Sequence, residues 1–182
     1  MTWDAFHRRG EVLRSVVAHA ESRRDGVLPM ELPGVAETFG DELSLLGALQ
    51  LRWHTRLAGA VERELTSNPA ELEQAVLTAW RTTARELAGV RAILDACTEQ
   101  PRSEEMARML DTAHRKDWAL MAAMAGKASP SDEVAHRIGR SLEEKARAAY
   151  RPTARPHRSA GRHAATPGRT TLLERVRAHL VA

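Results

Sequence analysis

Four polar residues, Gln50, His54, His114 and Asp117, lie in segments whose apolar residues recur with a helical period. At about 100° per residue, Gln50 falls near the centre of the apolar face of its segment and His54 on the flank. Asp117 points inward among methionines, with His114 at the flank one turn earlier. We therefore expect the four side chains to converge inside the protein. A structural network of buried polar groups that satisfy one another is the first interpretation. An acid–base or metal site is the second, because general bases and metal ligands both use an imidazole held by a carboxylate.

The spacing of acidic residues and histidines departs from that of carboxylate-bridged di-iron bundles. Glu133 and His136 have the Glu-x-x-His spacing, but His136 lies almost opposite the apolar stripe of its segment. The residues of that stripe, which we expect to be buried, are Val134, Ile138, Leu142 and Ala146. Asp111 and His114 are only half turned inward. Cys97 is the only cysteine, which excludes an internal disulfide and a thiolate cluster. We therefore predict no metal site and no cofactor.

The elements that must position these residues are all predicted to be helical. The organising helix is expected over residues 34–69, and about 30 residues of helix would be about 45 Å long. Further helices are expected over residues 3–24, from Pro69 to about 88, 104–127 and 132–150, with a short apolar segment at 90–97. No stretch alternates with a period of two, so no sheet is expected. The predicted fold is an all-α, up-and-down bundle of about five helices.

Charge divides the chain into three parts. Residues 151–182 contain seven arginines and one glutamate, a formal charge of +6, so the other residues must carry −3 of the total of +3. Residues 1–150 are predicted to form the bundle domain. Residues 151–169, rich in arginine and proline, are predicted to be a disordered basic linker. Residues 170–182 have the pattern of a short amphipathic helix.

Two kinds of contact are expected from this tail. Leu172, Leu173, Val176 and Leu180 share one face of the final helix and would bind a protein partner. The linker arginines would attach weakly and without sequence preference to nucleic acid or to an anionic membrane surface. These arginines are Arg151, Arg155, Arg158, Arg162 and Arg169.

The remaining candidates have simpler explanations. Three of the four tryptophans lie on predicted core stripes, whereas Trp118 projects away from the methionine face and is expected to contact another helix or a partner. Arg52, Arg56 and Arg63 lie on the polar side of the organising helix, where we expect a solvated face partly neutralised by Glu62, with an anion-binding patch as the alternative.

The leading functional hypothesis is a non-enzymatic interaction protein that holds a partner through its tethered final helix. A metal-dependent or acid–base enzyme with a site inside the bundle is the second hypothesis, and electrostatic attachment through the basic tail is the third. The chain has no predicted membrane span and no secretory signal, which indicates a cytoplasmic protein. The frequent alanine and arginine are typical of helical proteins from high-GC bacteria, but no family resemblance accompanies this composition.

Overall fold

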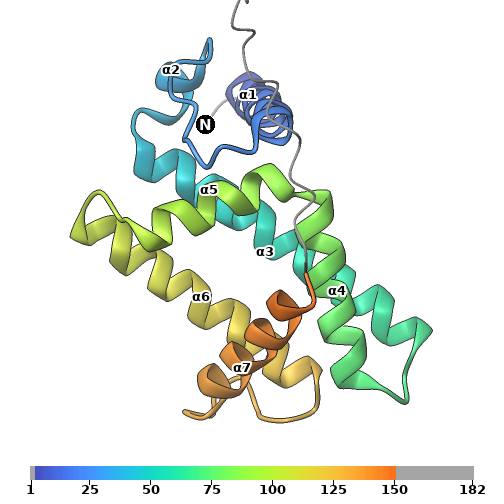
Figure 1. The fold of residues 1–182 in the computed structure, drawn as a ribbon. Helices are drawn as coiled ribbons and strands as arrows, with labels where there is room; N and C mark the ends of the chain where they lie inside the picture. Colours follow the sequence, from blue (N-terminus) through green and yellow to red (C-terminus); the bar gives the residue numbers. More distant parts are fainter. Residues whose placement is uncertain (1–2, 151–182) are drawn as a thin grey trace, which may run out of the picture. The chain divides into compact units, whose positions relative to one another are not determined.

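The computed structural model describes residues 3–150, and every regular element in this range is an α-helix (Figure 1). The seven helices are α1 (Trp3–Arg23), α2 (Val35–Phe39), α3 (Glu42–Ser67), α4 (Leu72–Glu86), α5 (Ala88–Glu99), α6 (Glu104–Met124) and α7 (Ala135–Ala148). The all-helical class is therefore confirmed for the described residues. The expectation of about five helices is corrected to seven.

The organising helix predicted over residues 34–69 is broken near its start. Gly40, with φ of 79°, ends the short helix α2 in a left-handed conformation that glycine adopts without strain. Asp41 then caps α3, because its side chain accepts a hydrogen bond from the Ser44 backbone N–H at 2.7 Å. The remaining 26 residues of α3 still form a long helix, about 39 Å in length.

Two further boundaries differ from the prediction. The short apolar segment at 90–97 is the central part of the longer helix α5, which contacts α1, α3, α4 and α6. The helix predicted to begin at Pro69 starts instead at Leu72, without a side-chain cap, and Asn68 lies at the C-terminal end of α3.

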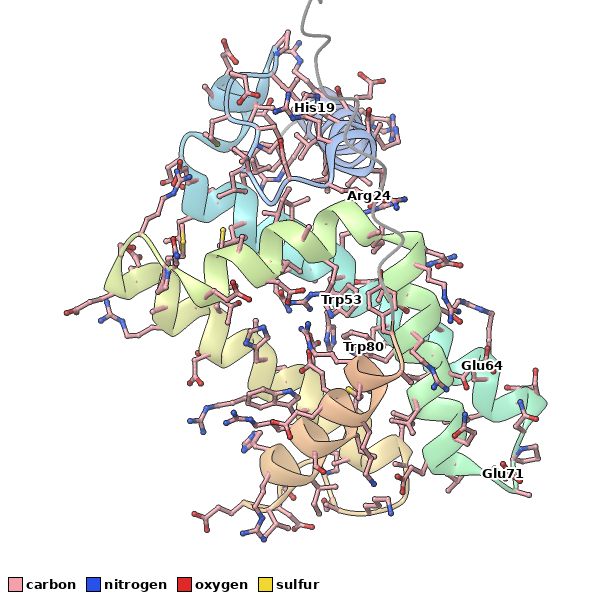
Figure 2. The ribbon with its side chains drawn as sticks, in the orientation of Figure 1. His19, Arg24, Trp53, Glu64, Glu71 and Trp80 are labelled. Carbon is pink, nitrogen blue, oxygen red and sulfur yellow. The ribbon has the colours of Figure 1, made fainter. Side chains whose placement is uncertain are left out.

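The helices are not all aligned along one direction, as an up-and-down bundle would require. Figure 1 looks along the axis of α1, whereas α3, α5 and α6 run across the view. Trp53 and Trp80, each 1% exposed, point into the interior between the helices (Figure 2). Their rings meet edge to face at 5.9 Å, and Trp80 meets Tyr150 in the same way at 5.8 Å. The prediction that these two tryptophans belong to the core is confirmed.

Each helix that the structure describes is too short or too polar to cross a membrane.

Candidate functional site

Three of the four predicted site residues meet where α3 faces α6. His54 Nδ1 lies 2.5 Å from Asp117 Oδ1, and Gln50 Nε2 donates a hydrogen bond to Asp117 Oδ2 at 3.0 Å. Gln50 and His54 are one turn apart on α3, so their side chains reach the same carboxylate. Both oxygens of Asp117 are thereby engaged.

Asp117 occupies a core position of α6. Ser103 caps this helix by accepting a hydrogen bond from the Met106 N–H, and this cap fixes where the helix begins. The buried face then contains Met106, Leu110, Asp117 and Met121, and the Asp117 side chain is only 6% exposed. Burial of a carboxylate is costly unless hydrogen bonds compensate for the lost water. Gln50 and His54 supply that compensation.

Asp117 controls the charge of His54. The hydrogen bond to Asp117 raises the pKa of His54 above its ordinary value, and the negative charge of Asp117 adds to this effect. Partial burial and the nearby positive charge of Lys116 act in the opposite direction. Because a carboxylate accepts hydrogen bonds, Nδ1 of His54 carries the proton. Nε2 is therefore the ring atom left to exchange a proton with a ligand.

His54 and Asp117 line a cleft of about 620 Å³ between α3 and α6. This volume lies in the range of small-molecule sites. The apolar lining residues are Gly47, Leu51, Met109 and Ala113, and the other lining residues are Gln50, His54, Glu105, Arg108, Thr112, Lys116 and Asp117. At Gly47, an added Cβ would meet no atom within 4 Å, so this wall of the cleft is open.

Gln50 adds an unsatisfied acceptor to the site. The residue is 5% exposed, and its Oε1 accepts no hydrogen bond from the described residues. A buried amide oxygen without a donor is costly. The oxygen itself is buried, so a ligand in the cleft could reach it only if the Gln50 side chain moved.

His114 does not join the other three residues, which corrects the predicted four-residue convergence. Its ring stacks on Trp118 at a centroid distance of 5.7 Å and lines a separate cavity of about 390 Å³. Burial, and then the positive charge of Arg91, lower the pKa of His114. Its Nε2 is buried and has no hydrogen-bond partner among residues 3–150. His114 and Asp117 are three residues apart, so their side chains leave α6 at directions that differ by about 60° around the helix axis. Asp117 therefore lines the cleft between α3 and α6, whereas His114 lines the other cavity.

Sequence reasoning missed a second polar cluster that holds α5, α6 and α7 together. Arg147 binds Asp95 (Nη2 to Oδ1, 2.8 Å) and Glu143 (Nε to Oε1, 2.9 Å). Trp118 Nε1 donates to Glu143 at 2.6 Å, so this tryptophan contacts another helix, which was one of the two expectations for it. The 3%-exposed Arg91 lies 2.7 Å from Asp95. The available signal was the i, i+4 spacing of Arg91 with Asp95 and of Glu143 with Arg147.

Burial alone would lower the pKa of Arg147, but its hydrogen bond to Asp95 and the charges of Glu143 and Asp95 raise it. Arg147 therefore stays charged and holds both carboxylates. We interpret this second cluster as structural, because its acids and bases neutralise one another.

The remaining predicted site residues lie outside the described residues. They comprise the linker arginines Arg151, Arg155, Arg158, Arg162 and Arg169 and the apolar residues Leu172, Leu173, Val176 and Leu180. Within residues 3–150, no group of three or more His, Cys, Asp or Glu side chains is arranged to hold a metal ion.

No protein-family model, curated protein or solved structure matches this chain. The function is therefore inferred from the geometry of the site.

Proposed function

We propose that the cleft between α3 and α6 binds a small, partly apolar molecule and that His54 exchanges a proton with it. The observation that carries this proposal is the 2.5 Å contact between His54 Nδ1 and the buried Asp117 carboxylate at the edge of a cleft of about 620 Å³. In this arrangement the carboxylate fixes the imidazole and Nε2 acts as a general base or acid.

The lining indicates the kind of ligand. Met109, Ala113 and Leu51 suit an apolar or aromatic group. Charges of both signs, on Glu105, Arg108 and Lys116, are also present in the lining. The ligand class is therefore a small amphiphilic molecule with a hydrolysable or ionisable group beside an apolar part.

The test uses p-nitrophenyl acetate, an activated ester with an aromatic ring that fits an apolar cleft. Neutral His54 would take a proton from water through Nε2 while the water oxygen attacks the ester carbonyl. The bond from the carbonyl carbon to the phenolic oxygen would then break to give acetic acid and p-nitrophenolate, and His54 would release its proton to solvent. We expect hydrolysis to fall at least about tenfold in His54→Gln. Because the pKa of His54 is raised, the wild-type rate should increase with pH through a midpoint above the ordinary histidine value.

The matched control is His136→Gln, on α7, which removes a histidine that does not line the cleft. Its rate and pH profile should equal those of the wild type. Equal rates in the His54 and His136 variants would show that ester hydrolysis is not a property of the cleft, and the proposal would be abandoned.

We also propose, from the sequence pattern, that residues 170–182 bind a protein partner as an amphipathic helix while residues 151–169 act as a linker. The supporting observation is the shared apolar face of Leu172, Leu173, Val176 and Leu180. Leu173→Asp should abolish partner binding and leave the melting temperature of the helical domain unchanged. A large loss of stability would contradict this second proposal.

The linker arginines support a further, purely electrostatic proposal of attachment to nucleic acid or anionic lipid. Such binding should disappear in moderate salt and in a chain that ends at Tyr150.

A further inference from the structure

A second groove runs along the other exposed side of α3 and is lined by three arginines of that helix. It has a volume of about 770 Å³ and lies among α1, α3 and the junction of α4 with α5. We call it the arginine groove. Its lining residues are Leu13, Ala48, Leu51, Arg52, Thr55, Arg56, Gly59, Arg63, Glu86 and Leu87.

The charge of the arginine groove is only partly neutralised. Arg56 Nε donates to Glu86 Oε2 at 2.5 Å, so the neutralising acid is Glu86 of α4 and not Glu62 as the sequence suggested. Arg52 and Arg63 are exposed, and neither side chain forms a hydrogen bond or ion pair with a residue in the range 3–150. The charge of Arg63 acts on Glu86 from a longer distance, and Glu86 already pairs with Arg56. Three arginines and one glutamate leave the groove with a formal charge of +2, in a domain whose net formal charge is −3.

The same groove exposes apolar surface. Leu51 is 65% exposed, the highest value among the large apolar side chains that the structure describes. Leu13, Leu87 and Ala48 also line the groove. Ala48 and Gly59 have small or absent side chains, so a partner backbone can approach α3 closely there. Apolar contacts are therefore available next to unpaired positive charge.

We propose that the arginine groove binds an acidic amphipathic helix of a partner protein. Arg52 and Arg63 are 11 residues apart on α3, a distance of about 16 Å along the axis, or three turns of a partner helix. Helix-in-groove recognition uses apolar side chains at i, i+3 or i+4, and i+7. Such side chains would contact Leu51 and Leu13, and flanking glutamates would bind Arg52 and Arg63.

This inference does not rest on the proton exchange assigned to His54, because the arginine groove contains neither His54 nor Asp117 and shares only Leu51 with the lining of the cleft. It also uses a different part of the protein from the C-terminal helix.

The test measures fluorescence anisotropy of a labelled 18-residue helical peptide that carries leucine at i, i+4, i+7 and i+11 and glutamate on both flanks. A second peptide has glutamine in place of every glutamate. We expect the glutamate peptide to bind the full chain, and Arg52→Glu with Arg63→Glu to weaken binding about tenfold or more. Binding should also weaken as salt is raised.

The control for charge reversal is Arg8→Glu with Arg137→Glu, which changes two exposed arginines outside the groove by the same total charge. Its affinity should stay within about twofold of the wild-type value. If the reversed groove variant is unstable by circular dichroism, Arg52→Gln with Arg63→Gln replaces it, and a smaller loss in the same direction is expected.

Three results would overturn the proposal. The first is equal affinity of the groove and control variants for the glutamate peptide. The second is equal affinity of the wild type for the glutamate and glutamine peptides. The third is binding of single-stranded DNA that depends on Arg52 and Arg63 without any binding of the peptide, which would assign the groove to nucleic acid.

Discussion

At the scale of single residues, Asp117 links the two helices of the cleft and sets the charge of His54. Asp117→Asn keeps the size of the side chain and an oxygen that accepts from His54 Nδ1. Gln50 can turn its amide so that its free Oε1 accepts from the amide group that this substitution introduces. The negative charge is lost, so the pKa of His54 should fall toward its ordinary value. Histidine NMR titration of the folded variant measures this shift.

Asp117→Ala is the contrasting substitution, because it leaves the buried Gln50 amide nitrogen without an acceptor. It should lower the free energy of unfolding by about 1–3 kcal/mol. An unchanged His54 pKa in Asp117→Asn would mean that the 2.5 Å contact does not control the imidazole.

The two candidate histidines should have opposite effects on stability as pH changes. The raised pKa of His54 stabilises the folded state fully below the ordinary value of about 6.5, and this stabilisation is lost as pH rises through the raised pKa. The lowered pKa of His114 has the opposite sign: the unfolded state takes up a proton first, so stability falls as pH drops below about 6.5.

Urea unfolding of His54→Gln and His114→Gln at pH 5 and pH 8 measures this difference. Relative to the wild type, His54→Gln should lose more free energy of unfolding at pH 5 than at pH 8. For His114→Gln, the free energy of unfolding relative to the wild type should be higher at pH 5 than at pH 8. The same pH dependence in both variants would contradict the assignment of the two environments.

At the scale of the elements, α6 and α7 come close together through a glycine. A Cβ at Gly139 would lie 2.0 Å from the backbone oxygen of Trp118, so no larger residue fits without moving a helix. Gly139→Ala should therefore lower the free energy of unfolding by about 1–3 kcal/mol or more. Gly47→Ala is the matched control: it lies in α3 with open space around it and should raise stability by up to about 1 kcal/mol. Thermal unfolding of both variants measures the difference, and a loss in both would contradict the packing argument.

This contact also explains one error in the sequence-based prediction for α7. The stripe expected to be buried consists of Val134, Ile138, Leu142 and Ala146. Leu142 and Ala146 are buried as expected, but Val134 precedes the helix and is 42% exposed. The buried face includes Ala135 and Gly139, because close backbone approach selects small residues rather than the most apolar ones. Local signals for helix ends were not sufficient either, because the helix expected from Pro69 begins only at Leu72 and without a side-chain cap.

At the scale of the whole molecule, helical periodicity was enough to predict the all-helical class and to bring Gln50, His54 and Asp117 to one place. Periodicity was not enough to predict the surroundings of His114, because tertiary packing decides which helix lies against each side of α6. The arginine groove could not be predicted from the sequence for the same reason. Glu86 and Leu13 belong to α4 and α1, and only folding places them beside α3.

The two concave sites adjoin one another on α3, because Leu51 lines both the cleft and the arginine groove. Leu51→Asp should therefore weaken both ester hydrolysis and peptide binding. It should leave the melting temperature within a few degrees of the wild-type value, because Leu51 is 65% exposed. Met109→Asp should affect hydrolysis alone, and the Arg52 and Arg63 reversal should affect peptide binding alone.

The three variants, assayed with both probes, separate the sites. A loss of both activities in Met109→Asp, with an unchanged melting temperature, would mean that the cleft and the groove act as one site. An effect of Leu51→Asp on only one probe would assign that leucine, and the exposed apolar surface it provides, to the corresponding site.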